Sequence, residues 1–169
     1  MTEFKDFYCT LRENLEHYNG EYASFIDCGP NLFKLLCDVL EEEVLDKESR
    51  LEISAAISYY VVPMDVIPET IYGPYGYIDD IYISVYVLQR IADKYGCDLL
   101  QKVWSFNNDV KEVIQECYEK SAEVLDEDQI EAILYSPVTN KDTRGFHQEV
   151  MLLPRGKTSN TSVLIRKIS

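Results

Sequence analysis

The sequence predicts an all-α fold, a compact bundle of about six helices with a C-terminal extended or β-hairpin segment. Apolar residues recur at helical spacing through most of residues 1–136, and glycine, proline and asparagine separate these stretches. After Pro137, two short runs rich in Val, Leu and Ile replace the helical pattern. We therefore divide the chain into a helical domain, residues 1–136, and a basic extended tail or hairpin, residues 137–169.

The first helix is expected over residues 2–18, with Thr2 as its N-cap and Asn19 and Gly20 as its stop signal. A short helical turn is expected over residues 21–27. The apolar face of the first helix comprises Phe4, Phe7, Tyr8, Leu11, Leu15 and Tyr18.

Two longer helices follow. Pro30 suits the first turn of a helix over residues 30–45, and Asp46 or Lys47 begins another that runs to about Val62. The latter is apolar almost all round, which is typical of a helix at the centre of a bundle. The apolar face of the helix over residues 30–45 comprises Leu32, Phe33, Leu36, Val39, Leu40 and Val44.

The second half of the domain is also predicted to be helical. Gly96 ends a long helix, Asn107 or Asn108 opens a later one, and Asp126 caps the last. The expected segments are residues 77–95, 97–105, 108–125 and 126–135.

A proline- and glycine-containing loop connects the two most apolar helices. Pro63 and Pro68 each disfavour the α conformation in the residue before them, and Gly76 continues the irregular turn. We interpret these three residues as structural. The loop and the helix start that follows it carry four carboxylates close together in the sequence: Asp65, Glu69, Asp79 and Asp80.

This pattern resembles the YkvA-like family, a domain of unknown function, over about residues 32–92. The resemblance rests on prolines, acidic residues and a glycine that all fall in register. They read Pro63-x-Asp65-x-Ile67-Pro68-Glu69, followed by Gly76-x-x-Asp79-Asp80, with Glu69 where the family usually has Asp. The resemblance implies an all-helical fold with this loop at a helix–helix corner, and it implies no activity.

The four carboxylates admit two interpretations. In the structural one, Asp65 accepts backbone N–H bonds in the turn, and Asp79 and Asp80 occupy the first helical turn, where the helix dipole favours negative charge. In the functional one, Asp65, Glu69, Asp79 and Asp80 converge on Mg²⁺, Mn²⁺ or Ca²⁺, which prefer oxygen ligands. A hydrolase would follow if the metal held an activated water. We favour the structural interpretation, predict no catalytic residue and no cofactor, and keep the divalent cation as the alternative.

Tyrosine is unusually frequent, with thirteen residues, seven of which lie between Tyr59 and Tyr86. Tyrosine is enriched at protein–protein interfaces because it combines apolar area with a polar tip. A core in which each hydroxyl reaches the solvent edge explains the same residues. The candidates for an aromatic docking surface are Tyr72, Tyr75, Tyr82 and Tyr86.

Charge is unevenly distributed along the chain. The net charge is −14, and residues 140–169 hold six basic and two acidic side chains, which leaves −18 for residues 1–139. An acidic body repels phosphate backbones, so we expect no direct nucleic-acid binding. A basic tail on an acidic body is typical of a docking element, although the tail could also fold back onto the body. The docking candidates in the tail are Arg155, Lys157, Arg166 and Lys167.

Five cysteines occur without any CxxC spacing, and no apolar run reaches the length of a membrane span. We therefore expect reduced thiols and a cytoplasmic protein, with the membrane surface as a further hypothesis. We predict that the protein is a non-enzymatic interaction or accessory subunit of a multi-protein system. Its Tyr-rich corner and basic tail would bind a protein partner, the tail by adding a strand to a sheet edge.

Overall fold

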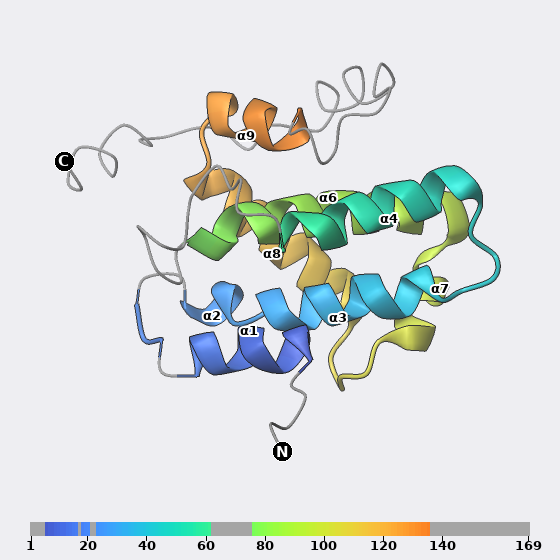
Figure 1. The fold of residues 1–169 in the computed structure, drawn as a ribbon, viewed down its shortest axis with the longest axis horizontal. Helices are drawn as coiled ribbons and strands as arrows, with labels where there is room; N and C mark the ends of the chain where they lie inside the picture. The colour runs from blue at the N-terminus through green and yellow to red at the C-terminus, as the bar shows by residue number, and fades with distance from the viewer. Residues whose placement is uncertain (1–5, 17, 21–22, 62–75, 136–169) are drawn as a thin grey trace.

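The computed structural model describes residues 6–16, 18–20, 23–61 and 76–135, and the regular elements in these ranges are α-helices. The predicted all-α fold is therefore confirmed for this part of the chain, while the predicted hairpin of residues 137–169 lies outside it. The helices, labelled as in Figure 1, are α1 (Phe7–Leu15), α2 (Ala23–Ile26), α3 (Gly29–Leu40), α4 (Lys47–Tyr59), α6 (Ile78–Tyr95), α7 (Cys97–Val103), α8 (Val110–Val124) and α9 (Glu127–Leu134).

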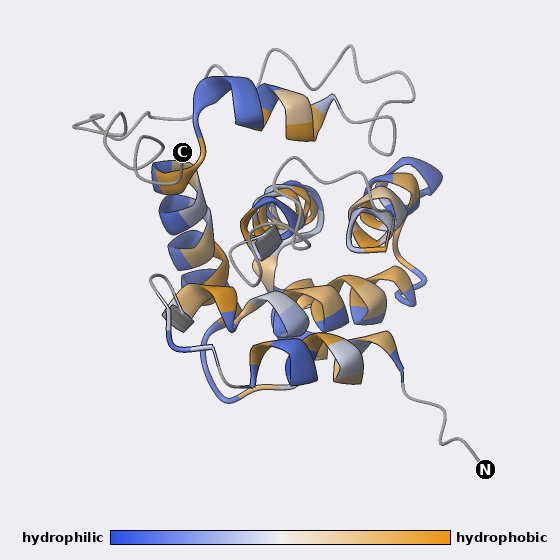
Figure 2. Cartoon of the chain, turned by 60° about the vertical axis from the view of Figure 1, so that its left-hand side comes forward, coloured by the Kyte–Doolittle hydropathy of each residue, from blue (hydrophilic) through white to orange (hydrophobic). Residues whose placement is uncertain are grey.

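Helix α6 is the centre of the fold. Twelve of its 18 residues are buried, and it contacts α3, α4, α7, α8 and α9. Helices α4 and α6 run side by side, with α1 and α3 in a layer beneath them, α8 along their flank and α9 above (Figures 1 and 2). The hydrophobic sides of the surrounding helices turn toward α6 (Figure 2). The core is therefore one continuous cluster around α6.

The prediction that the helix ending near Val62 lies at the centre of the bundle is wrong. Helix α4 buries Ile53, Ala56 and Tyr59, but Leu51 is 62% exposed and Val61 is also exposed. The N-terminal half of α4 carries several charged side chains, which require one side of the helix to face water. Residues 81–88 of α6 contain no charged residue, so α6 can be surrounded by other helices.

Two helix starts differ from those predicted. Helix α1 begins after Asp6, whose carboxylate accepts a 2.8 Å hydrogen bond from the Cys9 amide, so Thr2 is not its N-cap. Helix α8 begins after Asp109 and not at Asn107 or Asn108. In both cases an aspartate closer to the first helical turn supplies the oxygen that satisfies the free amides.

Three other predicted boundaries are confirmed. Asp46 caps α4, accepting a 2.9 Å hydrogen bond from the amide of Ser49. Asp126 caps α9 in a capping box with Gln129. Gly96 ends α6 with a φ of 91°, a conformation that side chains with a Cβ rarely adopt.

Helix α3 ends at Leu40, earlier than the predicted residue 45, and Val44 is 58% exposed where an inward position was expected. Arg50 of α4 explains this early end. Its guanidinium donates hydrogen bonds to the carbonyl oxygens of Leu40 at 2.6 Å, Glu42 at 2.7 Å and Leu45 at 3.3 Å. One side chain thereby satisfies the last carbonyl of α3 and two carbonyls of the α3–α4 connection.

Candidate functional site

The structure describes two of the four predicted site carboxylates, Asp79 and Asp80. Asp79 and Asp80 lie in the first turn of α6, as the structural interpretation predicted. Asp65, Glu69, Pro63 and Pro68 lie outside the described residues, as do Tyr72, Tyr75 and all four basic candidates of the tail. Gly76 is described and lies two residues before α6.

Both aspartates of α6 are fully buried, with 0% of each side chain exposed. Burying a carboxylate is costly unless hydrogen bonds or opposite charges compensate for the lost water. The Tyr59 hydroxyl donates to Oδ2 of Asp79 at 3.2 Å, and the backbone amide of Asp80 donates to Oδ1 of Asp79 at 3.2 Å. The position at the N-terminus of an 18-residue helix adds a favourable dipole. Asp79 therefore connects the last turn of α4 to the first turn of α6.

A second polar chain lies in the same part of the core. The Tyr60 hydroxyl donates to the carbonyl oxygen of Gly29 at 3.2 Å. The Ser84 hydroxyl donates to the carbonyl oxygen of Asp80 at 2.7 Å and lies 3.1 Å from the Tyr60 hydroxyl oxygen. Burial, and next the negative charge of Asp80, raise the pKa of Tyr60, so this phenol stays neutral and available as a donor. These bonds join the start of α3, the end of α4 and α6.

The described residues contain no group of three or more His, Cys, Asp or Glu side chains that could hold a metal ion. Asp79 and Asp80 supply two carboxylates, and the predicted four-carboxylate set depends on Asp65 and Glu69. Within the described residues, the Asp79 carboxylate is hydrogen-bonded to Tyr59 at the end of α4. This arrangement can brace a helix corner.

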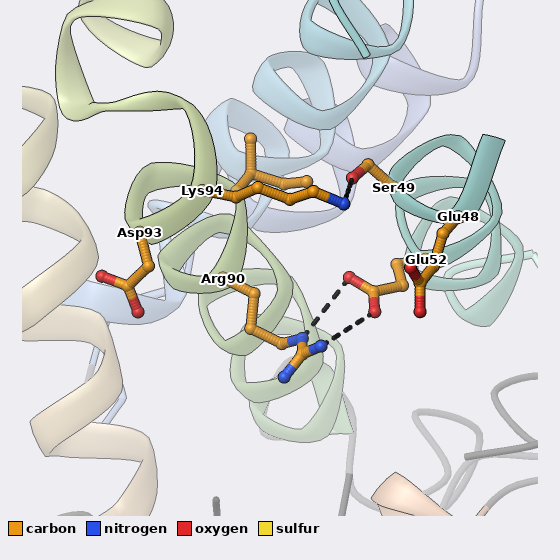
Figure 3. A pocket seen from close by; sticks show the side chains of 7 residues that line it. Glu48, Ser49, Glu52, Arg90, Asp93 and Lys94 are labelled. Atoms are coloured by element: carbon orange, nitrogen blue, oxygen red, sulfur yellow. Dashed lines mark hydrogen bonds and ion pairs between the residues drawn. The ribbon is translucent and has the colours of Figure 1, made fainter. Parts of the chain in front are cut away.

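A shallow pocket between α4 and α6, of about 270 Å³, was not predicted (Figure 3). Arg90 donates to Glu52 from Nη2 at 3.1 Å and from Nε at 3.4 Å. Lys94 lies 3.3 Å from the Ser49 hydroxyl and 2.6 Å from Oδ2 of Asp46. The remaining residues that line the pocket are Glu48, Ile91 and Asp93. Arg90 and Lys94 of α6 are thus both bonded to side chains at or near the start of α4. We interpret the pocket as part of the polar contact between these two helices.

The comparisons with known proteins match the segment that contains the proline and aspartate motif of residues 63–80. The family model described as "Protein of unknown function (DUF1232)" matches residues 49–86. The chain is 34% identical over 118 residues to "Uncharacterized protein ORF9" of Methanothermobacter thermautotrophicus, an alignment that covers 69% of this chain and 81% of that protein. The chain belongs to the DUF1232 family, to which YkvA-like proteins belong, so the predicted resemblance is confirmed. No solved structure matches it.

The DUF1232 segment begins in α4 and ends in α6, so it contains both partners of the Tyr59–Asp79 hydrogen bond. Among the described residues, no helix is long and apolar enough to cross a membrane.

The prediction that Tyr82 and Tyr86 form an exposed docking surface is wrong. Tyr82 is 1% and Tyr86 is 4% exposed. The Tyr82 ring stacks on Tyr86, with centroids 6.5 Å apart, and on Tyr118 of α8, with centroids 5.8 Å apart. Burial raises the pKa of Tyr82. These rings pack α6 against α8, and the four-residue spacing of Tyr82 and Tyr86 reflects the side of α6 that faces α8.

Proposed function

We propose that this DUF1232 protein is a non-enzymatic interaction or accessory subunit in the cytoplasm, with an acidic helical body and a basic docking tail, residues 137–169. The full burial of Asp79 and Asp80 is the observation that carries this proposal. A carboxylate that exchanges a proton with a substrate must come within hydrogen-bond reach of it. Both side chains are fully buried, and the contacts of Asp79 with Tyr59 and the Asp80 amide are those of a structural brace.

The distribution of charge supports a protein partner. Residues 140–169 carry a net charge of +4 and the remainder carries −18. A tail of opposite sign to its own body is suited to an acidic or mixed-charge partner surface, where attraction speeds association. The Val-, Leu- and Ile-rich runs of the tail, residues 146–153 and 161–168, would then add a strand to the edge of the partner's sheet.

A tail deletion tests this proposal. Affinity purification from the native host with the full chain identifies the partner, and the purified partner is then titrated with the full chain and with residues 1–136. We expect the deletion to abolish binding and to leave the thermal unfolding midpoint nearly unchanged. A truncated chain that unfolds would show that the tail belongs to the body, and a folded truncated chain that binds equally well would overturn the docking role.

Reversing two charges in the tail, compared with reversing one on the helical body, tests whether the tail charges themselves contribute to partner binding. We expect Arg166→Glu combined with Lys167→Glu to weaken partner binding more than tenfold at low salt. The control is Lys111→Glu, at an exposed position of α8, which should change binding little.

The metal alternative is tested by calorimetric titration of the full chain with Mg²⁺, Mn²⁺ and Ca²⁺. We expect no saturable heat and no thermal shift at millimolar metal. Saturable heat that disappears in both Asp65→Asn and Asp79→Asn would favour the carboxylate site over the structural interpretation.

A further inference from the structure

Two large apolar side chains are exposed where α3 connects to α4. Val44, in the connection, is 58% exposed, and Leu51 of α4 is 62% exposed. The buried residues Ile53, Ala56 and Tyr59 lie on the side of α4 that packs against α3 and α6. At about 3.6 residues per turn, Leu51 lies on the opposite side of the helix. The described part of the chain therefore leaves this side uncovered, and we call residues 41–48 together with Leu51 the α3–α4 surface.

The α3–α4 surface is also acidic. Residues 41–48 contain five carboxylates and one lysine. The fold pairs two of these carboxylates, Glu42 and Asp46, with lysines of α7 and α6. Glu41 and Glu43 are exposed, and neither forms an ion pair within the described part of the chain. A segment that covers this surface should therefore combine apolar side chains with positive charge.

A second acidic surface, along α8 and α9, lacks the apolar component. Residues 109–131 contain nine carboxylates and two lysines. The large hydrophobic side chains that are exposed in the described chain are Val44, Leu51 and Val61, and none of them belongs to α8 or α9. Charge alone would favour either surface for a basic segment, so the exposed apolar side chains are what distinguish the α3–α4 surface.

Residues 161–168 of the C-terminal tail have the complementary composition. Residues 150–169 contain four basic side chains and no acidic one. The other apolar run of the tail, residues 146–153, contains Glu149 and neither lysine nor arginine, so it matches an acidic surface less well. The apolar residues of the matching run are Val163, Leu164, Ile165 and Ile168, and its basic residues are Arg166 and Lys167.

The chain is long enough to bring this run to the α3–α4 surface. The described residues end at Tyr135, directly after α9, which lies above α4 and α6 (Figures 1 and 2). An extended chain spans about 3.3 Å per residue, so the segment between Tyr135 and Val163 can reach roughly 90 Å. The 18 residues of α6 span only about 27 Å. A tethered segment also acts at an effective concentration of about millimolar, so a weak site is sufficient.

We propose that residues 161–168 dock on the α3–α4 surface of their own chain. The apolar side chains of the run cover Val44 and Leu51, and its two cations lie beside the carboxylates of residues 41–43. The consequence of this docking rests on the proposed function, because a tail held on its own body must leave that body before it binds a partner. The apparent affinity for the partner is then reduced to the fraction of chains whose tail is free.

The test uses the full chain without a partner, so a negative result here leaves the proposed partner binding intact. An equal mixture of unlabelled and isotopically labelled chains is treated with a carbodiimide, which joins a lysine amine to a carboxylate in direct contact. Mass spectrometry then identifies the cross-linked peptides. We expect Lys167 to be joined to a carboxylate of residues 41–48, with both peptides carrying the same label.

Three outcomes would overturn the proposal. Cross-links between peptides of different label would show that the tail binds a second copy of the chain. Cross-links of Lys167 to carboxylates of α8 and α9 would show that the tail docks by charge alone. The absence of any cross-link from the tail to the body would show that it does not dock.

Leu51→Ser tests the apolar contact without removing a group that can be cross-linked. We expect this variant to lower the yield of the cross-link roughly tenfold, the order expected when a leucine loses a buried contact. The matched control is Val61→Ser, because Val61 is 60% exposed and follows the other end of α4. Its yield should equal that of the unmodified chain. Circular dichroism verifies that both variants fold, and equal yields from Leu51→Ser and the unmodified chain would contradict the docking site.

Discussion

The hydroxyl of Tyr59, in the last turn of α4, donates a 3.2 Å hydrogen bond to the carboxylate of Asp79, in the first turn of α6. Both side chains are buried, at 2% and 0% exposure. Tyr59→Phe removes one hydroxyl and leaves a buried carboxylate with one donor fewer. We expect the free energy of unfolding to fall by about 1–3 kcal/mol, the cost of weakening the solvation of a buried polar group. Chemical denaturation monitored by circular dichroism measures this change in the free energy of unfolding.

Tyr8→Phe is the control for this variant, because Tyr8 is a half-buried tyrosine of α1 outside the aspartate corner. It should change the free energy of unfolding by no more than about 0.5 kcal/mol. Equal effects of the two variants would mean that the Tyr59–Asp79 bond contributes nothing specific to the corner.

Arg50 supplies a second test of how the helices are joined. Its guanidinium donates to three backbone carbonyls at the end of α3 and in the loop that follows, among them Leu40 and Glu42. A lysine keeps the charge but cannot present donors in a planar fork. We expect Arg50→Lys to lower the free energy of unfolding by about 1–3 kcal/mol, measured by denaturant titration at constant salt.

Arg12→Lys, at an exposed position of α1, is the matched control and should have little effect on stability. Hydrogen exchange gives a second readout for Arg50→Lys: amides in the last turn of α3 should exchange faster. Unchanged protection there would contradict the role assigned to the guanidinium.

The pH dependence of stability should report on Asp46. The Lys94 ammonium, and next the hydrogen bonds of Ser49, hold the pKa of Asp46 well below its usual range. A depressed carboxyl pKa contributes stability above the unfolded-state value, and that contribution is lost as pH falls toward the folded-state value. The loss should therefore begin below about pH 3.9, the ordinary aspartate pKa, and continue into stronger acid.

Asp46→Asn isolates this contribution, because asparagine still caps a helix but carries no charge. The stability difference between the unmodified chain and Asp46→Asn should be largest at neutral pH and shrink toward zero in acid. Asp46→Ala, which also removes the cap, should remain less stable than Asp46→Asn throughout. A difference that stays constant with pH would show that the charge of Asp46 contributes nothing.

The parts of this fold that were predictable from the sequence are those fixed by local chemistry. Asp46, Asp126 and Gly96 each act on their own helix end, and Asp79 and Asp80 lie in the first turn of α6, where the helix dipole favours negative charge. Apolar spacing also located α6 correctly. Such signals depend on neighbours within a few residues, and therefore need no knowledge of the tertiary fold.

Contacts between helices that are distant in the sequence could not be predicted from local patterns. The spacing of tyrosines in α6 leaves both a docking surface and the core open for Tyr82, because it does not reveal that Tyr118 of α8 stacks on it. Glu52 and Arg90 meet only because α4 and α6 lie side by side. The relative burial of α4 and α6 is a different case, because the charged residues in the N-terminal half of α4 are a local signal that favours α6 as the centre.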